Sequence, residues 1–140
     1  MTTAKDIAAS DVVTAARNET LSDVAGTMRD EHVGSVVIEE DDLPVGIVTD
    51  RQIALGVADD PEVGHETVDG VMTRDVETIP AGATVFQAVQ TLSDEGIRRA
   101  PVVDSDGELV GLLSLDDLLF VIEEEYDAAE DVIEAQSPRF

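Results

Sequence analysis

The sequence predicts a mixed α/β (α+β) fold in which two β-α-β-β-α repeats pack sheet to sheet with pseudo-two-fold symmetry. The main observation is an internal repeat: Val12 to Val33 aligns without a gap with Val76 to Ile97, at an offset of 64 residues. One inserted residue then brings Gly111 opposite Gly46. A unit of about 60 residues buries too little surface to be stable alone, so the two repeats should share one body.

Each repeat has the same elements in the same order. A short extended piece that holds Thr14 or Thr78 leads through a turn to a helix that begins near Thr20 or Thr84, where apolar residues recur at helical spacing. Two strands joined by a polar turn of four to six residues, "EEDDLP" or "DSDG", then form a hairpin, and a second helix follows directly. The strands are predicted at Ser35–Ile38, Val45–Val48, Ala100–Val103 and Leu109–Leu113, and the second helices begin at Asp50 and Leu115.

The chain is therefore divided into four parts. These are the first repeat at residues 6–58, a polar connector at 59–70, the second repeat at 71–122 and a helical extension at 123–140. Along the last helix an apolar stripe recurs at steps of three and four residues, at Leu119, Ile122, Tyr126, Ala129 and Ile133. We expect this stripe to pack either on the first residues of the chain or on a second subunit.

The charge balance excludes several classes of partner. The 140 residues carry 32 Asp and Glu against 8 Lys and Arg, a formal net charge of -24 that is spread along the chain. Molar salt shortens the screening length to about 3 Å, so the composition favours a protein of a halophilic archaeon that keeps molar salt in the cell. Nucleic acid and anionic membranes are poor partners for such a surface. No signal peptide or membrane span is evident, and a cytoplasmic location is expected.

No catalytic or metal site is predicted. Cysteine is absent, and the two histidines, His32 and His65, have no partner at metal-ligand spacing. No serine has a plausible histidine partner, and no glycine-rich phosphate loop is present. We therefore expect a protein that is not an enzyme and requires no cofactor.

One motif is repeated with a single important difference. "GIVTDRQI" begins at Gly46 and "GLLSLDDL" begins at Gly111, and each places a hydroxyl residue where a strand ends and a polar side chain three residues later. That last side chain is Gln52 in the first copy and Asp117 in the second. A hydroxyl residue followed by such a side chain is also typical of a helix capping box, so from the residues alone capping and ligand binding both remain possible.

Three stretches in this order carry a resemblance to a known family: "SVVIEEDDLPVGIVTDRQI", "VMTRDVETIP" and "IRRAPVVDSDGELVGLLSLDDL". From about Asp6 to Ile122 the chain resembles a tandem pair of CBS domains, the modules named after cystathionine β-synthase, and so a stand-alone Bateman module. The resemblance implies a disc with two clefts that bind adenosine-containing ligands, such as AMP, ADP, ATP or S-adenosylmethionine, and it favours a homodimer. It also implies that Asp117 accepts hydrogen bonds from a ribose, which a neutral amide at Gln52 does less well.

The expected ligand contacts fall into two sets. The stronger cleft is expected to use Thr78, Ile79, Pro80, Arg98, Arg99, Ala100, Pro101, Ser114 and Asp117. The weaker cleft is expected to use Thr14, Ala15, Ser35, Val36, Thr49, Arg51 and Gln52. Within these sets the resemblance implies that the backbone near Thr78 reads an adenine edge and that the small side chain of Ala100 leaves room for a flat base.

Cations are scarce, so the adjacent Arg98 and Arg99 are notable. A guanidinium suits phosphate geometry, which favours a phosphorylated ligand, although pairing with nearby acids explains the two residues as well. Arg51 could serve a phosphate at either cleft. The alternative function is a protein interaction or dimerisation scaffold whose clefts are empty and whose motifs act only as helix caps.

Overall fold

The computed structural model describes residues 2–136 and confirms the β-α-β-β-α order of both repeats. The first repeat consists of β1 (Thr14–Ala16), α2 (Leu21–Glu31), β2 (Ser35–Glu40), β3 (Leu43–Thr49) and α3 (Asp50–Asp59). The second consists of β5 (Ile79–Pro80), α4 (Val85–Glu95), β6 (Arg99–Val103), β7 (Leu109–Ser114) and α5 (Leu115–Gln136). A short helix α1 (Ala4–Ile7) precedes them, and η1 (Val63–His65), η2 (Val68–Gly70) and β4 (Thr73–Arg74) lie between them.

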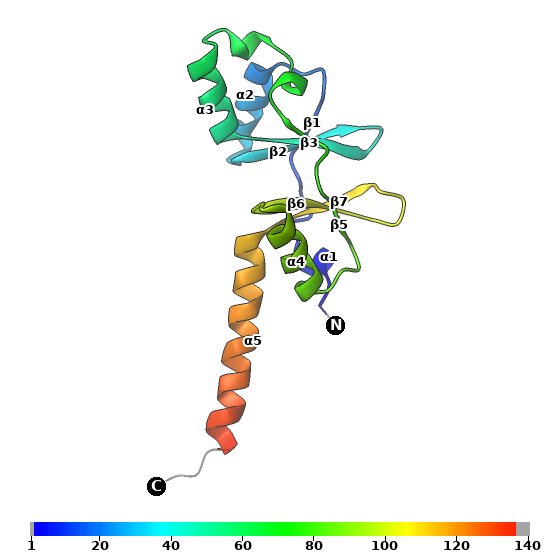
Figure 1. Ribbon diagram of the computed structural model, residues 1–140, viewed down its shortest axis with the longest axis vertical. Helices are drawn as coiled ribbons and strands as arrows, with labels where there is room; N and C mark the ends of the chain where they lie inside the picture. The colour runs from blue at the N-terminus through cyan, green and yellow to red at the C-terminus, as the bar shows by residue number, and fades with distance from the viewer. Residues whose placement is uncertain (1, 137–140) are drawn as a thin grey trace.

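The two sheets lie between two sets of helices. One sheet has the strand order β1-β2-β3-β4 and the other β5-β6-β7, and in both the first strand runs parallel to the second while the hairpin is antiparallel. Helices α2 and α3 cover the outer side of the first sheet, and α1, α4 and the start of α5 cover the outer side of the second (Figure 1). The inner sides face each other, as the predicted pseudo-symmetry requires.

Local sequence explains where the elements begin and end. The Thr20 and Thr84 hydroxyls cap α2 and α4 by accepting backbone N–H groups three residues later, and Gly96 ends α4 with a positive φ of 64°. The first hairpin turn is shorter than predicted. It consists of Asp41 and Asp42 alone, both with positive φ, which suits the twist of the flanking strands and lets them lengthen.

Each repeat has its own hydrophobic core. Val36 and Ile38 lie in the core beneath α2, and Ala100 and Val102 lie in the equivalent core of the second repeat. Since side chains alternate along a strand, Val37 and its equivalent Pro101 point to the opposite faces, and both are fully buried there. The faces that the sheets turn toward each other are therefore closed at their centre.

The segment before each repeat packs on the other repeat. At the N-terminus the Ala4 N–H donates to the Ala83 carbonyl at 2.8 Å, and Ala9 exchanges two hydrogen bonds of 3.0 Å with Leu112. In the predicted polar connector, η1 and η2 bring Val63 and Val68 into the core of the first repeat. The polar sequence at 59–70 thus contains buried apolar positions, and α1 is the counterpart of η2.

An ion-pair cluster fixes the connector on the first repeat. Arg17 bonds Asp69 at 3.0 Å and Glu40 at 2.7 Å, and Arg74 bonds the other oxygen of Asp69 at 3.1 Å. The Arg17 hydrogen bond holds the pKa of the Asp69 carboxyl below its ordinary value of 3.8. The cluster holds β4, which begins at Thr73, at the edge of the first sheet.

The glycine of each repeated motif, Gly46 or Gly111, allows the segment that precedes the other repeat to pack closely against it. A Cβ on Gly111 would lie 2.8 Å from the Ala8 Cβ and 3.1 Å from the Ala9 carbonyl oxygen. A Cβ on the equivalent Gly46 would collide with the Met72 side chain. Glycine is needed at both positions because the incoming segment takes the space of a side chain.

We expect Gly111→Ala to destabilise the protein by about 1–3 kcal/mol, since the new methyl group meets the backbone of the N-terminal segment. Thermal unfolding measures the effect. Gly82→Ala is the matched control, because a Cβ there would have no atom within 4 Å. Equal unfolding midpoints for the two variants would contradict the packing described here.

Candidate functional site

The Ser114–Asp117 pair stands where β7 passes into α5. The Asp117 N–H donates to the Ser114 hydroxyl at 3.2 Å, and the Ser114 N–H donates to Oδ2 of Asp117 at 3.3 Å. The pair therefore forms a helix cap. The second carboxylate oxygen of Asp117 accepts no hydrogen bond from another described residue, so the group keeps acceptor capacity.

The equivalent pair in the first repeat is used differently. The Gln52 N–H donates to the Thr49 hydroxyl at 3.2 Å, and the Gln52 side-chain oxygen accepts from the Thr49 N–H at 2.9 Å. In addition, Nε2 of Gln52 donates to the Thr73 hydroxyl at 2.8 Å. At the position equivalent to Thr73 the second repeat has Ala9, which offers no hydroxyl. Both ends of the Gln52 side-chain amide are thus engaged within the protein.

Two of the predicted residues are cross-strand neighbours of these caps. Arg99 pairs with Ser114 across β6 and β7, and Ser35 pairs with Thr49 across β2 and β3. The adjacent Ala100 points into the second core, so Arg99 lies on the opposite face, which is turned toward the first repeat. The side chains of Arg99, Ser114 and Asp117 therefore come from the same end of the β6–β7 hairpin.

A cavity of about 420 Å³ spans the boundary between the repeats. Its lining comes from Ile47, Thr49, Asp50, Arg51 and Thr73 on one side and from Ile97, Arg98 and Arg99 on the other. The structure thus brings Thr49 and Arg51 together with Arg98 and Arg99, which the sequence analysis divided between two clefts. Face-to-face packing of the sheets places the beginning of α3 beside the beginning of β6. The sequence pattern of a single repeat cannot reveal this juxtaposition.

The cations around this cavity differ in their pairing. Arg98 forms an ion pair of 3.5 Å with Asp116, and both side chains are mostly exposed. Neither Arg51 nor Arg99 forms an ion pair with another described residue, although the chain is strongly acidic. The two unpaired guanidinium groups make the cavity a favourable place for an anion.

Several other predicted residues have buried side chains. Ile79, Ala100 and Pro101 of the stronger set are buried, as are Ala15 and Val36 of the weaker set. A ligand could therefore reach only their backbone groups, and the expected contact of a base with the Ala100 side chain does not fit its place in the core. Thr14 is exposed, and Thr78 and Ser35 are partly buried.

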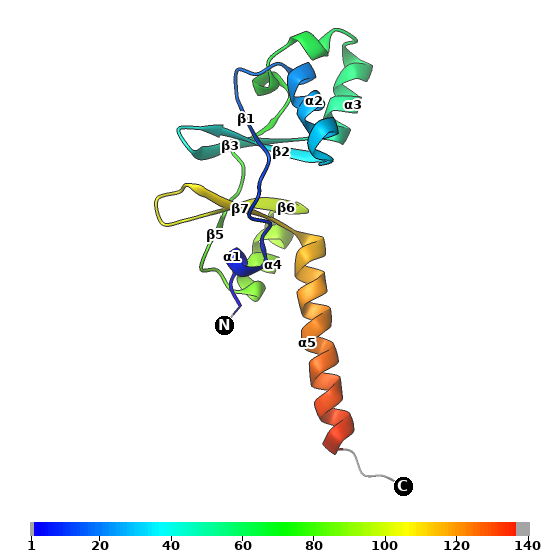
Figure 2. The ribbon, with the colours of Figure 1, turned by 180° about the vertical axis from the view of Figure 1, so that it is seen from behind.

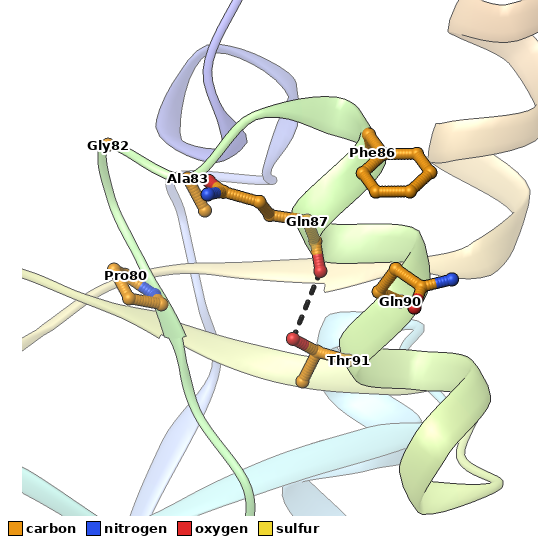
Figure 3. Close-up of a pocket in the computed structure, with 7 residues that line it drawn as sticks. All are labelled: Pro80, Gly82, Ala83, Phe86, Gln87, Gln90 and Thr91. Carbon is orange, nitrogen blue, oxygen red and sulfur yellow. Dashed lines mark hydrogen bonds between the residues drawn. The ribbon is translucent and has the colours of Figure 1, made fainter.

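Pro80 lines a cavity whose lining includes neither Ser114 nor Asp117. This cavity of about 490 Å³ lies against α4 and is lined by Pro80, Gly82, Ala83, Phe86, Gln87, Gln90 and Thr91 (Figure 3). The close-up shows Phe86 and Gln90 on α4 and Pro80 on the strand that leads to it, with the Thr91 hydroxyl donating to the Gln87 carbonyl at 3.1 Å. Phe86 belongs to no motif of the sequence, and its only signal there is an aromatic side chain in a chain with 3% aromatic residues.

Within residues 2–136, no group of three or more His, Asp or Glu side chains is placed to hold a metal ion. In the same part of the chain, no helix combines the length and the apolar character needed to cross a membrane.

Comparison with known proteins identifies both repeats. The sequence matches the family model of the CBS domain at residues 4–59 and again at 68–124. An uncharacterized protein of Methanopyrus kandleri is 36% identical over 118 residues, which are 83% of this chain and 60% of that protein, so the chain spans only part of this relative's length. The CBS domain-containing protein YhcV of Bacillus subtilis is 31% identical over 118 residues, which are 84% of each chain.

The fold agrees with solved structures of the same kind. The CBS domain pair of protein MJ0100, solved in complex with 5′-methylthioadenosine and S-adenosyl-L-methionine, has a TM-score of 0.78 and 25% sequence identity to this chain. The similarity covers 89% of this chain and 98% of that one. With the two family matches and the two pseudo-symmetric sheets, these findings establish that the chain belongs to the CBS domain family and carries two CBS domains in tandem.

Proposed function

We propose that this CBS pair is a regulatory module that binds an adenosine-containing ligand, with the ribose held by Asp117. The observation that supports this proposal best is that one carboxylate oxygen of Asp117, at the capped start of α5, accepts no hydrogen bond from another described residue. At the equivalent position the other repeat has Gln52, whose side-chain amide is hydrogen-bonded at both ends. A CBS pair of similar fold binds two adenosine-containing ligands, which supports this ligand class. AMP, ADP, ATP and S-adenosylmethionine all share the end of the molecule that Asp117 would hold.

The chemistry of Asp117 suits a ribose. A carboxylate can accept from both hydroxyls of a diol, and hydrogen bonds to a charged acceptor are about twice as strong as neutral ones. The Ser114 N–H holds Oδ2 at 3.3 Å and so orients the group without exhausting it. Gln52 offers one acceptor oxygen, which already accepts from the Thr49 N–H. We therefore expect the first repeat to bind such a ligand weakly or not at all.

The unpaired cations favour a phosphorylated ligand. Arg51 and Arg99 line one cavity from opposite repeats, so a phosphate between them would contact both repeats. A ligand that contacts both repeats stabilises one relative placement of the repeats. A partner protein that binds this placement more tightly than the placement without ligand would respond to the ligand. This is the physical basis for a regulatory role without catalysis and without a required cofactor.

A second candidate function is an interaction scaffold with empty clefts. It is favoured by the fact that both motifs form the hydrogen bonds of helix caps. It is also favoured by exposed apolar side chains at equivalent positions of the two repeats, Leu55 on α3 and Phe120 on α5. We propose that these two side chains contribute to a homodimer, which either function would use.

Asp117→Asn tests the proposed ligand site. Thermal unfolding is measured in molar KCl with and without AMP, ADP, ATP and S-adenosylmethionine. A ligand at 100 times its Kd should stabilise the wild type by about 2.7 kcal/mol, a rise of several degrees, and the substitution should abolish that rise while the cap survives. Gln52→Ala, at the equivalent position of the first repeat, is the control and should keep the rise. Should no ligand shift the wild-type midpoint, the scaffold function is favoured.

Arg99→Gln tests the phosphate contact. We expect it to weaken binding of whichever of AMP, ADP and ATP the wild type binds by about tenfold, because a charge-assisted hydrogen bond is lost. Binding of 5′-methylthioadenosine, which has no phosphate, should stay unchanged. Calorimetric titration measures both affinities. Equal losses for the two ligands would indicate a general disturbance of the site instead of a phosphate contact.

The homodimer is tested with Leu55→Asp and Phe120→Asp combined. The two new charges would be buried in the proposed interface, so the variant should be a monomer while its far-UV circular dichroism stays unchanged. Sedimentation equilibrium in molar KCl measures the mass. A wild type of monomer mass, or a variant that remains dimeric, would exclude this interface.

A further inference from the structure

The last part of α5 extends beyond the CBS fold. Leu118 is buried in the second core, but every residue from 122 to 136 is exposed. The family match ends at residue 124, whereas the helix continues to Gln136. Both views show the helix leaving the body of the protein (Figures 1 and 2). Residues 137–140 of the predicted extension lie outside the described residues.

The extending helix has the sequence pattern of one helix of a coiled coil. Leu119, Ile122, Tyr126 and Ala129 occupy successive a and d positions of a heptad. Three of these side chains are large and well exposed, with 53% of Leu119, 40% of Ile122 and 67% of Tyr126 accessible. The apolar stripe predicted from the sequence is therefore mostly exposed to solvent beyond the start of α5, which lies near α1.

The charges beside this stripe have one sign. With Leu119 at position a, the flanking e and g positions hold Glu123, Glu125, Glu130 and Val132, and α5 contains no Lys or Arg. In a coiled coil these positions decide which partner is accepted. A second copy of this helix would place Glu against Glu in either orientation, whereas a helix with Lys or Arg would form interhelical ion pairs.

The helix is also electrostatically unfavourable on its own. Like charges lie four residues apart at Glu123 and Asp127 and again at Asp127 and Asp131, and each such pair destabilises a helix. Acids also occupy the C-terminal turns, where the helix dipole favours cations. A segment without packing partners gains little stability from helix propensity alone. A cationic partner would relieve both repulsions.

We propose that residues 119–132 of α5 are a docking helix for an amphipathic helix of a partner protein that carries apolar a and d residues and Lys or Arg at its e and g positions. Leu119, Ile122 and Tyr126 bury the partner's apolar side chains, and Glu123, Glu125 and Glu130 select its charge. The site does not overlap the cavity between the repeats, so the proposal is independent of ligand binding.

The test uses the full chain and two synthetic peptides of three heptads, both with Leu at a and d, one with Lys and one with Glu at e and g. Fluorescence anisotropy of the labelled peptides measures binding in about 0.1 M and about 1 M KCl, where the Debye lengths are about 10 Å and about 3 Å. We expect the wild type to bind the Lys peptide at least about tenfold more tightly than the Glu peptide, most clearly at low salt. Combined Glu123→Lys, Glu125→Lys and Glu130→Lys should invert the preference.

Tyr126→Asp separates docking from attraction by net charge. It should abolish binding of the Lys peptide, and the matched control Asp131→Asn, on the opposite face of the helix, should retain it. Binding of the Lys peptide that survives Tyr126→Asp, absence of any preference between the peptides, or no binding of either peptide would overturn the proposal. A sedimentation mass that halves on Tyr126→Asp would also overturn it, because the stripe would then serve a second copy of the chain.

Discussion

The structure depends on the exchange of segments between the two repeats. Residues before β1 pack on the second repeat, and residues before β5 pack on the first, and in each case the segment lies against a glycine of the repeated motif, Gly111 or Gly46. The exchange buries Ala4 in one core and Val68 in the other. Because each repeat is completed by chain from outside itself, neither should be stable alone, and the sheets are held face to face.

This symmetric framework carries different chemistry at its two equivalent helix starts. Ser114 and Asp117 form a cap with an acceptor oxygen to spare, whereas Gln52 uses its amide to join α3 to Thr73 of β4. The difference extends to the neighbouring segment, where Thr73 corresponds to Ala9. One helix start is thus tied to the connector between the repeats, and the other keeps a carboxylate that a ligand could use.

The two proposals occupy separate parts of the protein. The cavity lined by Arg51 and Arg99 lies between the sheets, while the docking stripe lies on the part of α5 that leaves the body. The helix nevertheless starts at the Ser114–Asp117 pair. The cap and the stripe therefore belong to the same 22-residue helix.

The sequence by itself determined the repeat, the order of its elements and the helix starts, because these depend on local propensity, period and capping at residues such as Thr20, Thr84 and Ser114. It also predicted the long last helix and its stripe. Only the tertiary structure decided that Val63 and Val68 are core residues, that Ala100 faces the helices and that Arg51 and Arg99 line one cavity. These features arise where segments far apart in the chain meet, and a pattern read within one repeat contains no information on which face another repeat will cover.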